Sequence, residues 1–169
     1  MSAILSIIHK IDTVLATLIK PVVVIISLAI AFMLSYGIFS RALDEPVFGL
    51  EELVLMGAMW LYMLGAVLAS RDRSHLTADF VQVISSNARV IGFMRLLATS
   101  ISLFMAIMFA TWSNDLLLWG IKKGQTTPVF QLPWYLSQGS LFFASVLFIF
   151  YLIRDFFEDL ISFREPENG

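Results

Sequence analysis

The fold is decided by residues 21–40, PVVVIISLAIAFMLSYGIFS, which contain no charged side chain and lie between Lys20 and Arg41. A bilayer core about 30 Å thick is crossed by about 20 apolar residues in an α-helix, so this stretch is long enough to span it. Three further uncharged runs have a similar or greater length: residues 53–70, 96–114 and 124–153. Because a spanning segment must satisfy its own backbone hydrogen bonds, each run predicts a transmembrane helix.

We place the four predicted helices at residues 21–41, 51–70, 92–114 and 133–154. The fourth run is longer than one span needs, and Pro128 and Pro133 lie in its first third. Residues 124–128, GQTTP, have the composition of a loop. Pro133 is expected in the first turn of the last helix, where the missing N–H of proline costs little.

The composition agrees with a membrane protein. Hydrophobic residues make up 59% of the 169 residues and charged residues 14%, against about 45–50% and 25% in soluble domains. The net charge of −2 argues against a nucleic-acid partner, and the absence of cysteine excludes disulfides and thiolate chemistry. We therefore expect an all-α integral membrane protein that forms a single domain over residues 1–169 and carries no cofactor.

The segment that precedes the first span is amphipathic. Apolar residues recur at helical spacing over residues 2–19, whereas His9, Asp12 and Lys20 fall largely elsewhere. This pattern predicts an N-terminal amphipathic helix that lies in the membrane interface, and the alternative is an extension of the first span. Residues 76–84 have a similar pattern and form a possible second interfacial helix, and residues 155–169 are expected to form a cytoplasmic tail.

Positively charged residues are distributed unevenly between the two sides that four spans define. Eight Lys and Arg residues fall on the side of the termini and the second loop, and three fall on the other side. Short loops rich in Lys and Arg stay in the cytoplasm, so both termini are expected to be cytoplasmic. Trp119 and other aromatic residues gather around the outer loop, as in an aromatic belt.

The interiors of the four uncharged runs also contain no histidine. Ionisable groups inside a membrane mark ion paths, proton relays and substrate sites. Their absence from these runs argues against a chain that transports or catalyses by itself.

Small residues predict where helices approach closely. In the third predicted helix they recur every four positions, at Ala98, Ser102, Ala106 and Ala110. Such a stripe serves either packing within one bundle or docking of a partner protein. In the second helix Trp60 lies among Met56, Met59 and Met63, as part of an adaptable interface or as lipid-facing bulk.

Polar residues bracket the second predicted helix. Glu51 and Glu52 open it, which favours the positive end of the helix dipole, and they are placed to pair with Arg41 across a short loop. Arg71, His75 and Asp79 follow it at steps of four, so on one helix they would share a face and form a ladder. Three interpretations remain open: structural anchoring at the interface, contact with a partner or lipid headgroup, and a metal or catalytic site.

At these residues the sequence resembles the small membrane subunit of tripartite ATP-independent periplasmic (TRAP) transporters. The resemblance covers residues 21–155 and rests on an ordered set rather than one motif: Arg41, Glu51, Glu52, Gly65, Ala66, Arg71, His75, Asp79, Trp119, the loop of residues 124–128 that ends in Pro128, and Pro133. The chain departs from the family at Gly49-Leu50, where a Trp often precedes the Glu pair, and at Ala42, where an aromatic residue is frequent.

The resemblance implies a function. The family's small subunit is a scaffold that pairs with a large elevator-type permease subunit, which carries the substrate and sodium sites. A periplasmic binding protein delivers the substrate, usually an organic acid anion, and the complex lies in the inner membrane of bacteria or archaea. The competing hypotheses are a self-assembling small transporter or channel, and a membrane enzyme or electron-transfer anchor.

Overall fold

The computed structural model of the chain describes residues 2–72 and 88–164. These residues form four helices: α1 (Ser2–Ala42), α2 (Leu50–Arg71), α4 (Ala88–Lys123) and α5 (Tyr135–Arg164). All four are long and apolar enough to cross a membrane. The predicted all-α membrane fold is therefore confirmed for the described residues, whereas the possible second interfacial helix at residues 76–84 lies outside them.

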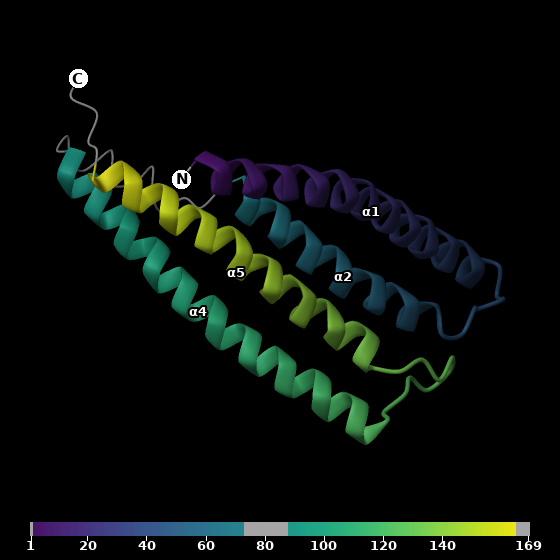
Figure 1. Cartoon of the computed structure of the whole chain (residues 1–169). Helices are drawn as coiled ribbons and strands as arrows, with labels where there is room; N and C mark the ends of the chain where they lie inside the picture. Colours follow the sequence, from purple (N-terminus) through teal and green to yellow (C-terminus); the bar gives the residue numbers. More distant parts are fainter. Residues whose placement is uncertain (1, 73–87, 165–169) are drawn as a thin grey trace.

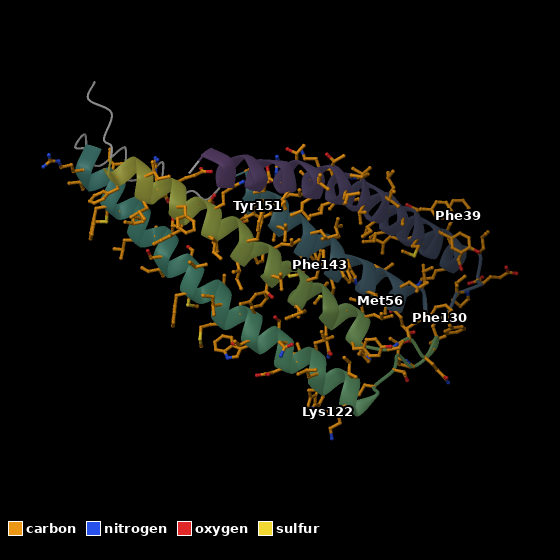
Figure 2. All side chains as sticks on the ribbon, viewed as in Figure 1. Phe39, Met56, Lys122, Phe130, Phe143 and Tyr151 are labelled. Carbon is orange, nitrogen blue, oxygen red and sulfur yellow. The ribbon has the colours of Figure 1, made fainter. Side chains whose placement is uncertain are left out.

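The helices form a chain of neighbours (Figure 1): α1 packs against α2, α2 against α5, and α5 against α4. The side chains at the centre of this arrangement come from α1, α2 and α5, and they are Ile19, Leu64, Val67, Ala144, Leu147 and Tyr151. α1 and α4 are the edge helices and carry many exposed apolar side chains. Figure 2 shows the contrast between Tyr151, which is enclosed by helices, and Phe39, which points away from α1. Such an apolar exterior suits contact with lipid or with another membrane protein.

The two ends of the molecule differ in which helices begin there and which finish there. At one end, which we name the Glu52 end, α1 and α4 finish while α2 and α5 begin. At the opposite Arg71 end, α1 and α4 begin while α2 and α5 finish. The start of α1 and the finish of α5 therefore lie at the same end of the molecule.

The first helix differs from the prediction. Separate helices were expected at residues 2–19 and 21–41, but α1 runs without a break from Ser2 to Ala42 and contains Pro21 in its interior. Proline removes one backbone hydrogen bond from a helix. Ala16 and Ile19 before it are buried and Val23 after it packs on the same core, so packing on both sides holds the helix together. An interfacial position for residues 2–19 stays a prediction.

Two other helices run past the expected spans. α4 extends from Ala88 to Lys123 around the span at residues 92–114, and α5 continues to Arg164 into the expected tail. A helix does not have to end where the hydrocarbon ends, because water also satisfies its backbone. α4 stops at Gly124, whose φ of 59° is the left-handed conformation that commonly ends helices. α5 starts two residues after Pro133, so this proline precedes the helix instead of lying in its first turn.

The contact between α4 and α5 follows a spacing of seven residues. Thr99 donates to Asp159 at 2.6 Å, and the hydroxyls of Ser113 and Ser145 lie 3.3 Å apart. The α4 residues along this seam are all small: Gly92, Thr99, Ala106, Ser113 and Gly120. A seven-residue repeat keeps one side of a helix against its neighbour in left-handed packing. Of the predicted four-residue stripe, Ala106 is the buried member, Ala98 and Ala110 are half-buried, and Ser102 is exposed.

Candidate functional site

The Glu52 end joins α1 to α2 through the predicted ion pair. The guanidinium of Arg41, in the last turn of α1, pairs with the carboxylate of Glu51 in the first turn of α2. Both side chains are exposed, so the pair contributes little stability by itself. Gly49 precedes α2 with a φ of 86°, and it caps the helix without a side-chain hydrogen bond. The two carboxylates then supply the negative charge that the start of a helix favours.

Glu52 has a different role from Glu51. Its carboxylate accepts hydrogen bonds from the backbone N–H of Val129 at 2.8 Å and of Phe130 at 3.1 Å. These residues belong to the connection between α4 and α5, so one side chain of α2 holds a loop almost 80 residues further along the chain. A methyl group at Gly49 would overlap both Phe130 and Val129, which shows how closely this loop packs on the start of α2.

The loop that Glu52 holds has its own internal order. Thr127 donates its backbone N–H to Leu132 at 2.9 Å, and its hydroxyl accepts from the backbone N–H of Leu132 at 3.0 Å. Pro133 pairs with Thr126 in an isolated antiparallel bridge, and Pro128 lies exposed at the loop's turn. Both prolines thus shape the loop that Glu52 holds.

Trp60 makes contacts within the molecule. Its indole N–H donates to the backbone oxygen of Leu136 at 3.1 Å, and its ring centre lies 6.0 Å from that of Phe143. The oxygen of Leu136 belongs to the first turn of α5. Trp60 therefore connects α2 to the first turn of α5, whereas Glu52 connects α2 to the loop that precedes α5.

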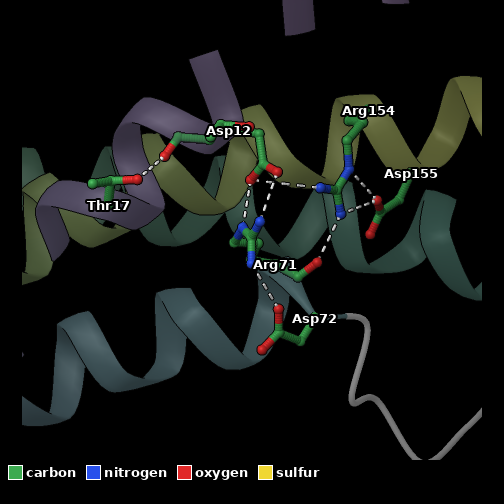
Figure 3. Close-up of polar contacts among 7 residues, drawn as sticks. Asp12, Thr17, Arg71, Asp72, Arg154 and Asp155 are labelled. Carbon is green, nitrogen blue, oxygen red and sulfur yellow. Dashed lines mark hydrogen bonds and ion pairs between the residues drawn. The ribbon is translucent and has the colours of Figure 1, made fainter. Parts of the chain in front are cut away.

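The Arg71 end holds a network of charges drawn from three helices (Figure 3). Arg71, at the end of α2, donates to both carboxylate oxygens of Asp12 on α1, at 2.6 and 3.0 Å. It also pairs with Asp72 at 3.1 Å. Arg154 on α5 donates to the backbone oxygen of Arg71 at 2.9 Å and pairs with Asp155 at 2.8 Å. A two-pronged guanidinium–carboxylate contact is among the strongest polar contacts that proteins form.

Most of this network is shielded from solvent. The side chains of Asp12 and Arg154 are each 9% exposed, and the nearest pair of their charged atoms is 3.9 Å apart. The guanidinium of Arg154 lies 5.2 Å from the centre of the fully buried Tyr151 ring. Buried charges are tolerated only where partners compensate for lost hydration. The network therefore specifies how α1, α2 and α5 meet, because another arrangement would leave a charge unpaired.

The ladder expected of Arg71, His75 and Asp79 stays a prediction. Among the described residues Arg71 pairs with Asp12 and Asp72, and α2 ends at Arg71. His75 and Asp79 lie outside the residues that the structure describes. Within the described residues, no group of three histidine or acidic side chains is placed to hold a metal ion.

The predicted site residues thus fall into separate places. The Glu52 end brings together five of them: Arg41, Glu51, Glu52, Pro128 and Pro133. Trp60 lies about two turns further along α2 and bonds the first turn of α5. Arg71 lies at the opposite end, Trp119 is exposed on α4, and Gly65 has no atom within 4 Å of the place where a Cβ would be. Sequence reasoning missed Asp12, Tyr151, Arg154 and Asp155 as members of one network. One feature of the sequence could have pointed to this network: Asp12 is the single carboxylate within the strongly apolar α1.

Comparison with protein families is consistent with this architecture. Residues 14–161 match the model of the family described as tripartite ATP-independent periplasmic transporters, DctQ component. Searches of curated proteins and of solved structures gave no match. The match includes most of each of the four described helices but begins after Asp12, and the family consists of transporter components rather than enzymes. The chain therefore belongs to the DctQ component family, as the small membrane subunit of a TRAP transporter.

Proposed function

We propose that this subunit is a rigid scaffold that holds and positions a large elevator-type permease subunit in the membrane. The observation that carries the proposal is that α2 is tied to its neighbours at both ends. Glu51 and Glu52 secure the Glu52 end, and the network around Arg71 secures the other. Charges engaged in such contacts are suited to keeping helices in place rather than to carrying a substrate.

The same reasoning places transport chemistry in the partner. Charged and histidine side chains within the membrane mark the paths of ions and substrates. The uncharged runs at residues 21–40, 53–70, 96–114 and 124–153 contain no Asp, Glu, Lys, Arg or His. We therefore assign the substrate and sodium sites to the large subunit, delivery of the substrate to a periplasmic binding protein, and no catalytic reaction to this chain.

The proposed orientation has both termini in the cytoplasm of a bacterial or archaeal cell. Lys and Arg are concentrated at the Arg71 end and in the segments that flank it. Positively charged short segments stay on the cytoplasmic side. The Glu52 end, with its loops, would then face the periplasm, where the binding protein delivers the substrate.

Isolation of the native complex tests this proposal. The chain is tagged after Gly169, extracted from native membranes in a mild detergent and analysed for associated proteins. We expect a larger multi-pass membrane protein in stoichiometric amount. A chain that elutes alone, or with copies of itself, would contradict the scaffold and favour a self-assembling channel.

Reconstitution extends the test to transport. Liposomes that contain both membrane subunits, a sodium gradient and the binding protein are expected to accumulate an organic acid anion. Liposomes that contain the small subunit alone are expected to accumulate none. Uptake by the small subunit alone would place the transport path in this chain and overturn the assignment.

A further inference from the structure

Among the residues that the structure describes, α1 and α5 leave one face of α2 open. α1 contacts α2 along one side, where the space beside Gly57 is filled by Ile30 and where Arg71 meets Asp12. α5 contacts a second side through Trp60. The residues that stay exposed fall on a third side, at helical spacings of seven, four and three: Leu55, Tyr62, Ala66 and Ala69.

Tyr62 is the unusual residue on this open face. It is 71% exposed, and its hydroxyl has no hydrogen-bond partner among the described residues. It lies ten residues from Glu52 and nine from Arg71, which places it about 15 Å from the first and about 13–14 Å from the second by helical rise, near the middle of the span. Tyrosines normally lie at the membrane surface, where the hydroxyl reaches water. At mid-depth the hydroxyl needs a hydrogen-bond acceptor that lipid chains do not provide.

The residues beside Tyr62 leave room for a close neighbour. Ala66 and Ala69 are small, and a Cβ added to Gly65 would meet no side chain and no other helix within 4 Å. Two helices approach closely in a membrane where small residues line the contact and a polar group bonds across it. A lipid tail would fill the space beside small residues, but it would leave the tyrosine hydroxyl unbonded.

We infer that this open face of α2 docks a transmembrane helix of the large permease subunit, with an acceptor oxygen placed opposite the Tyr62 hydroxyl. The inference rests on the proposed scaffold function, and it names which surface of the scaffold meets the partner. The helix that docks has small or apolar side chains and a free side-chain oxygen or exposed carbonyl near the middle of the bilayer.

The test compares variants of the tagged chain in native membranes and measures the ratio of large to small subunit after purification. Tyr62→Phe removes the hydroxyl alone and is expected to lower this ratio about fivefold. Ala66→Leu adds bulk to the contact and is expected to lower it about tenfold or more. The matched controls are Tyr36→Phe and Ala31→Leu, both on exposed positions of the edge helix α1, and they should leave the ratio unchanged.

A photo-crosslinking residue at position 66 identifies the neighbour directly. We expect an adduct with the large subunit, whereas the same residue at position 31 should give none. Adducts with a second copy of this 19.0 kDa chain, or with lipid alone, would overturn the inference. If the unmodified chain brings down the large subunit but Tyr62→Phe and Ala66→Leu do so equally well, the face is wrong and the scaffold function stands. If the unmodified chain brings down no large subunit, both proposals fail.

Discussion

Asp12 is the residue whose loss should matter most at the Arg71 end. It is the carboxylate that α1 contributes between Arg71 of α2 and Arg154 of α5. Asp12→Ala would leave these two guanidinium groups without that partner in a largely buried place. Removing one member of a buried pair is expensive, and we expect a cost of about 2–4 kcal/mol, or a fall of roughly 5–10 °C in the apparent melting temperature.

The matched control is Asp72→Ala, which removes another carboxylate from the same arginine. The Asp72 side chain is 60% exposed, so its pair with Arg71 is screened by water. We expect a change of about 1 °C or less, given that exposed pairs contribute little. Melting is followed by tryptophan fluorescence in detergent, and equal effects of the two substitutions would argue against a buried network that joins three helices.

Substitution of the two adjacent glutamates at the start of α2 should have different effects. Glu52→Ala removes the acceptor for the backbone N–H groups of Val129 and Phe130. Hydrogen–deuterium exchange at these two amides should become about tenfold faster, because charge-assisted hydrogen bonds protect them. Glu51→Ala, whose partner is Arg41, should leave their exchange unchanged. Faster exchange in both variants would mean that the loop depends on the stability of α2 as a whole.

At the scale of the helices, the spacing of the α4–α5 contact is open to a direct test. Ala106 is buried on the seven-residue seam, whereas Ser102, one turn away, is exposed. Ala106→Leu should therefore overpack the seam at a cost of about 1–3 kcal/mol. Ser102→Leu should be nearly neutral. If Ser102→Leu destabilises the protein as much as Ala106→Leu does, the four-residue stripe is the true contact. The measurement is the apparent melting temperature of each variant.

The helices themselves were predictable because a run of about 20 residues without a charge strongly indicates a membrane-spanning helix. Charges bound each run, and α2 ends within one residue of the predicted span at residues 51–70. The sequence left open whether residues 2–19 extend the first span, and it could not decide that α1 continues through Pro21, because this depends on the burial of Ala16 and Ile19 by other helices. Proline disfavours the interior of a helix, but here tertiary packing outweighs that preference, and such packing cannot be seen in a single sequence.

The site was predictable where partners are near in sequence and not where they are distant. Arg41 and Glu51 are ten residues apart, on either side of a short loop, and their pairing was expected. Asp12, Arg71 and Arg154 are brought together only by the order in which the helices pack. Helix order is set by side-chain complementarity along whole seams, and no short motif in the chain encodes it.

At the scale of the whole molecule, the four described helices place four of their termini at each end and leave broad apolar sides. Such a subunit has a sidedness that a single labelling experiment measures. The chain contains no cysteine, so one introduced cysteine is the sole thiol. The suitable positions are Glu45 in the loop between α1 and α2, and Asp72 after α2, because both are exposed and lie at opposite ends.

In right-side-out spheroplasts, a membrane-impermeant maleimide should label Glu45→Cys and should label Asp72→Cys only after the membrane is permeabilised. The reason is that Lys- and Arg-rich segments border the Arg71 end, and short segments of this kind stay on the cytoplasmic side of a membrane. Lys122 and Lys123 at the other end oppose this orientation, but they are outnumbered. Labelling in the reverse order would place both termini outside. It would also turn the Glu52 end, with the loop that Glu52 holds, away from the compartment in which a periplasmic binding protein delivers its substrate.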